Sequence, residues 1–448
     1  MIGAGVAGCA LVAELRRSGF AATISLWESG RGPGGRTATR RSRQDPGLRF
    51  DHGAPLFNVT GRDLPPLVER LLTAGAIESW KPERAVLTVS GSLRQEDAAD
   101  PFGQGALFRG RGGMEQLCQG LLGFAGEGVE PHYGAMVRDL ATSEQGLWQL
   151  LDPQGALLAS AHWLILASTL LAHPRSRLLL GWQHVPLARA ARGLADPELG
   201  HALAALASIR SEARSNLLLL AEGEAAAAWL GCPFRLLRFD GAAEQRWRLS
   251  RLAIQPLEDG RVAVVAHSSA VFAAEHLSVY GSRSSIASQL DQRPPREQEE
   301  AVIAELSEAV AGALAPWLRP EAVTQAPRQL MRWGAAFPQR PGLPAELALC
   351  RRSRVGFCGD YVEGEGFGRV EGALRSGSQL AQALLKAMAA EDSGGSGCFG
   401  GGGSGDGGGT GGGGTGGSAA IGVTGSGDGQ APSNGGARRR DGLRGGTD

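Results

Sequence analysis

The chain opens with Met1-Ile2-Gly3-Ala4-Gly5-Val6-Ala7-Gly8, and its three glycines fit the pattern G-x-G-x-x-G. In such a loop Gly3 permits a tight turn, Gly5 lets a pyrophosphate approach the backbone, and Gly8 lets the following helix pack closely on a strand. We therefore predict that this loop, including Val6 and Ala7, binds the phosphates of a dinucleotide.

The residues after the loop supply the neighbouring elements of a Rossmann unit. Apolar residues at Leu11 and Leu15 predict a helix that ends near Gly19, and Ala22–Trp27 is predicted to be a strand. That strand ends in Glu28, 20 residues past the last glycine of the loop. A carboxylate at this spacing accepts hydrogen bonds from the ribose hydroxyls of an adenine nucleotide. Helix, strand and acid together favour a dinucleotide site over a fortuitous glycine turn.

A second glycine pair lies just beyond this acid, in Gly34-Gly35-Arg36. Paired glycines let the backbone lie against the dinucleotide. Arg36 either offsets the charge of the pyrophosphate or holds the strand that runs beneath the flavin. This second motif resembles the flavin signature of the glutathione-reductase-type flavoproteins, so the predicted dinucleotide is FAD and not NAD. No His or Cys lies in a context for covalent attachment, and we expect FAD to bind non-covalently.

Composition narrows the class of protein. The 448 residues carry a formal net charge of zero, and nucleic-acid binding needs a basic surface, so we expect no nucleic-acid partner. The uncharged stretch Ala156–Pro174 is continuously apolar only over Trp163–Ala167, which is the length of a buried strand and not of a membrane span. Six scattered cysteines without C-x-x-C spacing predict neither a metal site nor a disulfide framework. We expect a soluble intracellular protein, cytoplasmic or organellar.

The carboxyl end differs in composition from the rest. Residues 393–448 contain 26 of the 69 glycines and almost no apolar side chains, so they are predicted to be a disordered Gly-rich tail. The preceding 392 residues exceed one ordinary domain, which predicts two domains.

Further motifs at both ends resemble one family. Gly34–Arg41 is followed by Phe50-Asp51-His52-Gly53-Ala54-Pro55-Leu56-Phe57, and the carboxyl end carries Val355–Asp360 and Gly368–Ala373. These blocks resemble the renalase-like branch of the flavin-containing amine oxidase superfamily. The likeness spans the whole 392-residue body and is weaker in the middle, where Arg332–Pro338 and His267–His276 are its best points of contact.

The resemblance implies an α/β fold of two domains. The first is a glutathione-reductase-type Rossmann domain that binds FAD and is assembled from discontinuous segments. The second is a substrate domain built on a mixed sheet. The implied boundaries are 1–57, 105–172 and 346–392 for the FAD domain, and 58–104 and 173–345 for the substrate domain. Met136–Leu140 would be the strand that meets the adenine, and Trp148–Leu151 with Ala156–Leu158 would form a hairpin.

The same resemblance implies most of the cofactor contacts. A strand that ends in Gly359-Asp360 is followed by a helix, and the helix N-terminus, with Val370, Glu371 and Gly372, would stabilise negative charge on reduced flavin. Asp360 would bind the ribityl or pyrophosphate part. The remaining implied contacts come from Ser29, His52, Gly53, Ala54, Pro55 and Val137.

Hydride transfer to flavin N5 needs a donor carbon held over the ring and water excluded. Trp333 and Phe337 would form an aromatic wall, and Trp333 and His267 are the predicted catalytic residues. The alternative for His267 is a structural histidine. Arg332 either binds a substrate phosphate or lies solvated on the surface. The only lysines, Lys81 and Lys386, lie outside the 250–340 region where amine-oxidising relatives carry one.

Three functional hypotheses follow. The first is a renalase-like FAD oxidoreductase that takes a hydride from a reduced nicotinamide-type small molecule, with oxygen as acceptor and hydrogen peroxide as product. The second is an oxidase or desaturase for amine or lipid-like substrates. The third is a degenerate, non-catalytic scaffold. It is motivated by the start of the chain, where only Met1 and Ile2 precede the first glycine although about five apolar residues are expected there. We attribute this to a late start codon, and we expect the sheet to lose its middle ladder.

Overall fold

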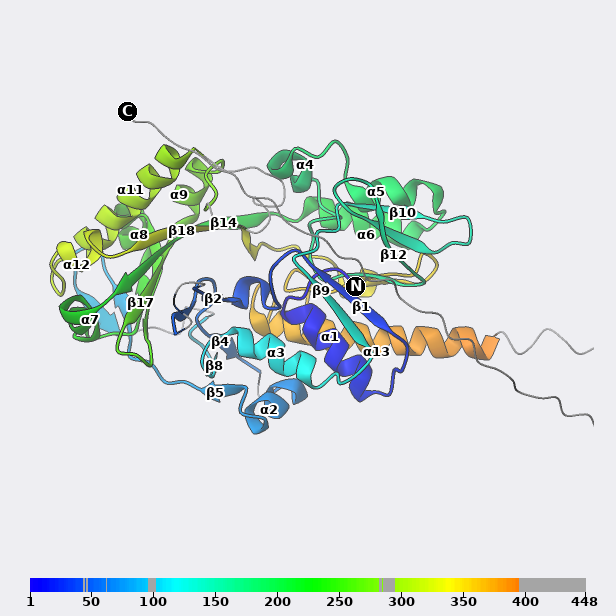
Figure 1. The fold of residues 1–448 in the computed structure, drawn as a ribbon, viewed down its shortest axis with the longest axis horizontal. Helices are drawn as coiled ribbons and strands as arrows, with labels where there is room; N and C mark the ends of the chain where they lie inside the picture. Colours follow the sequence, from blue (N-terminus) through cyan, green and yellow to red (C-terminus); the bar gives the residue numbers. More distant parts are fainter. Residues whose placement is uncertain are drawn as a thin grey trace, which may run out of the picture. The chain divides into compact units, whose positions relative to one another are not determined.

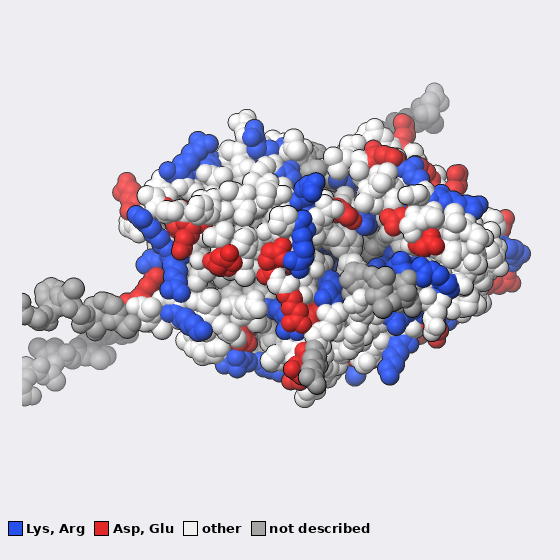
Figure 2. All heavy atoms as spheres, turned by 180° about the vertical axis from the view of Figure 1, so that it is seen from behind, with Lys and Arg blue, Asp and Glu red and all other residues white. Residues whose placement is uncertain are grey.

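The computed structural model describes residues 1–42, 45, 47–61, 63–95, 102–281, 284 and 295–394 (Figure 1). The predicted Gly-rich tail lies outside these residues, except that α13 (Val370–Gly394) extends to Gly394. None of the helices in the described ranges combines the length and the apolar character that a membrane span requires. On the face seen in Figure 2, Lys and Arg side chains are interspersed with Asp and Glu and form no single large patch.

The first layer is a Rossmann-like unit around α1 (Val6–Arg17) and β1 (Ile24–Glu28). The helix and strand predicted here are therefore confirmed. The α1 helix packs between α3 (Glu115–Gly123) and α13, as Figure 1 shows. Buried side chains on all three helices, such as Leu11, Leu117 and Leu384, share one core.

Two short parallel ladders meet at Ile2. On one side β1 pairs with β9 (Val129–Tyr133), and on the other β13 (Leu164–Leu166) pairs with β20 (Val355–Phe357), whose far edge carries β19 (Leu349–Cys350). Ile2 forms isolated parallel bridges to both Trp27 and Leu166. The ladder that we expected to be lost is therefore reduced to a few bonds, including Ile2 N to Ile165 O and Gly3 N to Trp27 O, both 2.8 Å.

The prediction of a strand over Met136–Leu140 is wrong. The parallel partner of β1 is β9, which ends before Gly134, and β10 (Asp139–Thr142) belongs to a separate antiparallel sheet. Pro131 and the polar residues of β9 concealed this strand, because they break the apolar pattern expected of a buried strand and because proline within a sheet is confined to edge strands and bulges. The predicted hairpin is confirmed as β11 (Trp148–Leu151) and β12 (Leu157–Ala161), which pair with β10.

A mixed sheet of seven strands is the largest in the described ranges. Its order is β18-β14-β17-β16-β15-β6-β7, and only β15 and β6 run parallel. The strands are β6 (Arg84–Leu87), β7 (Leu93–Gln95), β14 (Ser211–Ala221), β15 (Leu236–Phe239), β16 (Leu249–Pro256), β17 (Val262–Ser268) and β18 (Arg328–Pro338).

The two faces of this sheet differ because successive side chains of a strand point to opposite sides. Leu217, Leu219 and Val264 share a core with helices that cover one face, which Figure 1 shows on the left. These helices are α7 (Gly223–Leu230), α8 (Gly241–Trp247), α9 (Ala270–Glu275), α11 (Arg296–Leu314) and α12 (Glu321–Thr324). The opposite face carries Leu218 and Val265, which pack with Phe50 of β3 (Arg49–Asp51).

Smaller elements complete the Rossmann-like layer and the layer formed by the seven-stranded sheet. The sheet of β4 (Phe57–Val59), β8 (Ala106–Gly110) and β5 (Ile77–Ser79) packs in the same core as α1, together with α2 (Pro66–Thr73). Residues 58–104, expected to be one insertion in the substrate domain, therefore divide between two cores. The remaining elements are β2 (Thr39–Arg41), paired with β3, and α4 (Arg175–Leu180), α5 (Pro186–Ala190) and α6 (Pro197–Ser208).

Helix packing at Gly377 generates a stability prediction. A Cβ at this position of α13 would lie 2.3 Å from Ala7 O of α1, so Gly377→Ala forces the two helices apart. We expect a loss of about 1–3 kcal/mol in the free energy of unfolding, measured by urea denaturation. The control is Gly200→Ala, in the exposed interior of α6 with no atom within 4 Å of the new Cβ, where we expect a gain of about 0.5–1 kcal/mol. Equal effects at both positions would contradict the proposed helix contact.

Candidate functional site

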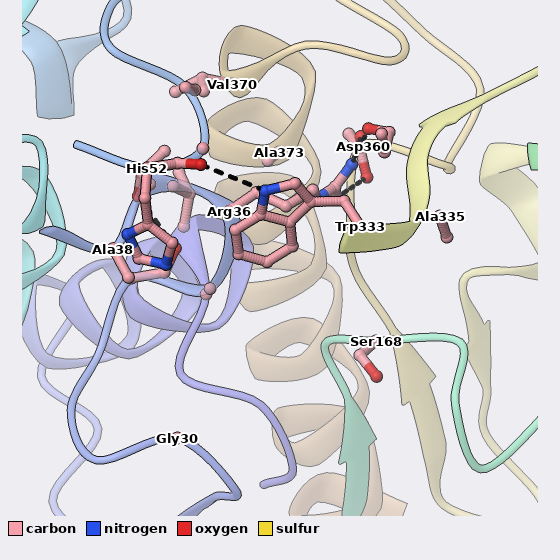
Figure 3. A pocket seen from close by; sticks show the side chains of 18 of the residues that line it. Gly30, Arg36, Ala38, His52, Ser168, Trp333, Ala335, Asp360, Val370 and Ala373 are labelled. Carbon is pink, nitrogen blue, oxygen red and sulfur yellow. Dashed lines mark hydrogen bonds and ion pairs between the residues drawn. The ribbon is translucent and has the colours of Figure 1, made fainter. Parts of the chain in front are cut away.

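A cavity of about 960 Å³ lies between the glycine loop and the seven-stranded sheet, within the size range of small-molecule sites. Figure 3 shows part of its lining. Of the predicted site residues, all except Gly8, Glu371 and Gly372 line this cavity. Those that do are Gly3, Gly5, Val6, Ala7, Glu28, Ser29, Gly34, Gly35, Arg36, His52, Gly53, Ala54, Pro55, Val137, His267, Trp333, Gly359, Asp360 and Val370. Their individual roles remain predictions.

The glycine loop has the geometry that an anion requires. Gly3 adopts a φ of 105°, a conformation that favours glycine, and a Cβ at Gly5 would meet nothing within 4 Å. Gly8 does not line the cavity. A Cβ there would lie 2.3 Å from Gly3 O, so glycine is needed for α1 to pack on the loop. No side chain caps the N-terminus of α1, which leaves its positive dipole end directed at the cavity.

Glu28 lies at the end of β1 and is held by backbone groups. Its Oε2 accepts a hydrogen bond from Ala4 N at 2.9 Å, and its Oε1 accepts one from Gly30 N at 2.6 Å. The Ser29 hydroxyl is 3.3 Å from Oε1. An ionised carboxylate offers about four lone-pair sites, so acceptor capacity remains for a ribose hydroxyl. The structure thus fixes the orientation of this carboxylate at the cavity wall.

Arg36 and Asp360 form a two-bond ion pair across the site. Nη1 donates to Oδ2 at 2.7 Å and Nη2 donates to Oδ1 at 2.6 Å, as Figure 3 shows. Nη1 also donates to Ala336 O of β18 at 2.7 Å. Two roles were predicted for Arg36, to offset the charge of the pyrophosphate or to hold the strand beneath the flavin. These contacts match the second role, because the side chain holds neighbouring segments of the chain. The carboxylate of Asp360, expected to bind the cofactor, is bound by this guanidinium.

Three side chains of the large sheet contact the backbone of His52 and Gly53. Asn216 Nδ2 donates to His52 O at 3.1 Å, and Trp333 Nε1 reaches the same oxygen at 3.4 Å (Figure 3). The rings of His52 and Trp333 stack at 5.5 Å, and His267 hydrogen-bonds the backbone of Gly53. Trp333 and His267 therefore position this turn, and their contact with substrate stays a prediction.

Burial sets the charge of both histidines. Desolvation lowers the pKa of His52 to about 3, with a further contribution from Arg40. Desolvation likewise lowers the pKa of His267 to about 3, and the nearby Arg251 and Arg214 lower it further. Both imidazoles are neutral at neutral pH, so they act as hydrogen-bonding groups and not as cations.

The N-terminus of α13 reaches the cavity only through Val370 and its neighbours. Glu371 is fully buried, and its carboxylate accepts hydrogen bonds from Thr60 N at 3.1 Å and Thr60 Oγ1 at 3.0 Å. Arg369 and Arg375 pair with it at 3.0 and 3.1 Å. The N–H of Gly372 donates to Gly366 O, so the prediction that it is a free donor is wrong. The side chain of Glu371 is thus fully engaged, so any stabilisation of negative charge on the flavin by this residue would have to come from its backbone.

Sequence reasoning missed Asn216 and most of the arginines on the sheet side. Arg214, Arg238 and Arg251 line the cavity, and so does Arg332, which was singled out. The sequence did contain a signal for them. Both Ser211–Ala221 and Leu249–Pro256 carry polar residues near the start of the strand and apolar residues after it, which indicates that the start of each strand faces a polar space. Both lysines are exposed and outside the cavity. The described residues contain no group of three potential metal ligands.

Comparisons with known proteins agree with this architecture. Residues 1–72 match the model of a family described as the NAD(P)-binding Rossmann-like domain. No curated protein matches the chain in sequence. The solved structure of cyclohexylamine oxidase from Brevibacterium oxydans is similar over 87% of this chain and 98% of its own, with a TM-score of 0.56 and 14% identity.

Two further structures have the same fold. Putrescine oxidase bound to putrescine matches with a TM-score of 0.51 and 14% identity, over 86% of this chain and 98% of its own. An oxidoreductase from Methanosarcina mazei matches with a TM-score of 0.52 and 14% identity, over 86% and 99% of the two chains. The chain therefore has a Rossmann-like unit within the fold of flavin amine oxidases. At such low identity the likeness shows the fold alone.

The buried His267 predicts a pH dependence of stability. Its pKa is lowered from 6.5 to about 3 in the folded chain, so folding disfavours its protonation. Its contribution to stability is therefore complete above about pH 6.5 and is lost as the pH falls toward 3. When the pH falls from about 7.5 to about 5, we expect the free energy of unfolding of the wild type to decrease by about 2 kcal/mol more than that of His267→Gln, as measured by urea denaturation. The control His201→Gln removes an exposed histidine and should behave like wild type.

Proposed function

We propose that this protein is an FAD-dependent oxidoreductase that takes a hydride from a reduced nicotinamide-type small molecule and passes the electrons to oxygen, giving hydrogen peroxide. The observation that carries the proposal is the cavity itself. It joins an uncapped helix N-terminus, an open glycine loop and an anchored carboxylate in the order along the chain that an adenine dinucleotide needs. The same proposal includes the renalase-like relationship and the assembly of the FAD domain from residues 1–57, 105–172 and 346–392.

The residues present fit FAD. Gly5 leaves space that a side chain would fill, and Gly35, with a φ of 56°, would bring a Cβ to 3.5 Å from the Cα of Gly5. The phosphates would lie against Gly3–Ala7 and Gly34–Arg36, the ribose on Glu28, and the flavin end near Gly53–Pro55, Gly359 and Val370. When bound, FAD would supply the hydride acceptor at its N5 atom.

The chain itself contributes positioning and exclusion of water. Asn216 and Trp333 fix the His52–Gly53 turn, which leaves little freedom for the wall above the proposed flavin. A donor held against Trp333 would be oriented without a proton-transferring group, and the two histidines nearby are weak bases because burial lowers the pKa of each to about 3. Oxygen is the proposed electron acceptor.

A second candidate is oxidation of amines or lipid-like molecules. The shared fold with cyclohexylamine oxidase and putrescine oxidase favours it. The composition of the cavity does not: lysine is absent from its lining, and the side formed by the large sheet carries arginines. Anaerobic bleaching of the flavin by amines but not by nicotinamides would support this candidate.

The proposal predicts the spectrum and substrate response of the purified protein. We expect flavin bands near ~370 and ~450 nm that reduced nicotinamide isomers bleach under anaerobic conditions. Absence of the bands would refute the flavoprotein proposal. Bands that no reduced nicotinamide bleaches would refute the substrate class only.

One substitution separates cofactor binding from folding. In Gly5→Asp the new Cβ meets nothing within 4 Å, and the residue sits at the N-cap of α1 with a φ of −75°, where aspartate is favourable. Its carboxylate would repel the pyrophosphate. We expect the flavin bands to be lost while the melting temperature of the flavin-free protein is unchanged or higher. The exposed Gly193→Asp should keep the flavin.

A further inference from the structure

A row of alternating arginine and phenylalanine side chains lies on the sheet side of the cavity. The guanidinium of Arg214 lies 5.1 Å from the ring centre of Phe337, and that of Arg251 lies 4.6 Å from the ring centre of Phe102. The two rings meet edge to face at 5.2 Å. We call these four residues the arginine–phenylalanine array. Stacking on a ring fixes a guanidinium plane. Nη1 and Nη2 of Arg214 donate to Ala213 O and Glu212 Oε2, whereas its buried Nε has no hydrogen-bond partner and is left for an anion.

The register of the sheet gathers further polar groups beside the array. Arg238 pairs with Arg251, Arg251 pairs with His267, and His267 pairs with Asn216 on four adjacent strands. Directly opposed residues project from the same face of a sheet. Asn216 is fully buried with Oδ1 unpartnered, and His267 is 9% exposed with Nε2 unpartnered. Both atoms are hydrogen-bond acceptors, because the neutral His267 donates through its other ring nitrogen to the Gly53 backbone, so they would accept from O–H or N–H groups of a ligand. The buried Nε of Arg214, which also has no partner, is a donor that an anionic group would satisfy.

The array also borders a second, smaller chamber of about 360 Å³. Arg214, Arg238, Arg251 and His267 line both spaces. The carboxylates of the smaller chamber are Glu212 and Glu244. Glu212 accepts from Arg214 Nη2 at 2.7 Å and from Gln339 Nε2 at 2.9 Å, so part of the positive charge is balanced there. Glu244 is the second carboxylate of this chamber, and burial raises its pKa.

In the part of the chain that the structure describes, the carboxylates that line the main cavity are all on its Rossmann side. Among the described residues they are Glu28, Glu115 and Asp360. Each is engaged: Glu28 by backbone N–H groups, Glu115 by Arg41 and Asp360 by Arg36. Within the described ranges, an ammonium group on the sheet side would therefore meet arginines and no lining carboxylate of the main cavity.

We infer that the arginine–phenylalanine array binds an anionic group of the substrate, a carboxylate or a phosphate, so that the donor is an organic acid or a phosphate ester and not a cationic amine. The inference rests on the proposed function, because it takes the remainder of the cavity as the flavin site. It goes beyond that function by assigning a charge and a binding position to the substrate. The phenylalanine rings suit a flat group attached to the anion.

The test compares ligands that share one ring and differ in charge. Benzoate, phenyl phosphate, benzamide and benzylamine are titrated into the wild-type protein, and binding is followed by the flavin spectrum and by thermal stabilisation. We expect at least one of the two anions to bind about tenfold more tightly than benzamide and benzylamine. This preference should shrink between about 0.05 and about 0.5 M NaCl. The stronger anion distinguishes a carboxylate site from a phosphate site.

Variants locate the binding. Arg214→Gln and Arg251→Gln should each lower the affinity for the preferred anion about tenfold and leave the affinity for benzamide unchanged. Arg214→Lys should retain part of the affinity for the anion. The matched control is Arg246→Gln, because Arg246 also stacks on an aromatic ring, Trp247 at 4.5 Å, but lines neither chamber. It should bind like wild type.

The outcomes separate this inference from the proposed function. Tighter binding of benzylamine, or equal effects of Arg214→Gln and Arg246→Gln, would overturn the anion subsite even in a yellow, flavin-containing protein. Conversely, a protein without flavin bands that is still stabilised by an anion through Arg214 would retain the subsite and refute the flavoprotein proposal. The wild-type ligand series decides the matter even if a variant fails to fold.

Discussion

The ion pair between Arg36 and Asp360 is the interaction on which the site depends. Its members are 324 residues apart, and the carboxylate is only 4% exposed. The same guanidinium donates to Ala336 O, so one side chain joins the second glycine loop, the segment after β20 and the strand β18. Removing Arg36 would leave the buried carboxylate of Asp360 uncompensated, which costs more than the pair itself contributes. Two layers made from distant parts of the sequence are thus aligned by one planar, two-bond contact.

A second constraint acts through the backbone and explains why glycine is needed next to His52. A Cβ at Gly53 would lie 2.1 Å from Arg36 O, and the N–H of Ala54 donates to that same oxygen. The turn is also bound from the sheet side through His52 O. Aromatic and imidazole side chains of the sheet are therefore occupied in holding the wall of the cavity. Residues chosen for chemistry from their type alone prove to have positioning contacts here.

Local patterns carried most of what the sequence could predict. The glycine loop, α1, β1 and the strand before Gly359 depend on spacings within about 30 residues, which periodicity and turn chemistry can read. Strand β9 was missed because an edge strand tolerates proline and polar residues. The array was missed for a different reason: Phe102, Arg214, Arg251 and Phe337 come from four separate segments. The large sheet brings Arg214, Arg251 and Phe337 together, and Phe102 joins them from the segment before β8. A single sequence does not contain these long-range pairings.

The electrostatic asymmetry of the cavity follows from these constraints. The carboxylates on the Rossmann side have structural roles, because Glu28 anchors the glycine loop and Asp360 pairs with Arg36. The sheet side has no such structural demand for acids, and its arginines keep their planes by stacking on rings. Desolvation keeps His267 neutral between these arginines. Repulsion by Arg251 and Arg214 further disfavours a positive charge on its ring. A dinucleotide bound at the loop would add negative charge at one end of the cavity only. The arginines that line the other end would then meet the substrate, which is why we infer an anion there and not a cation of the same shape.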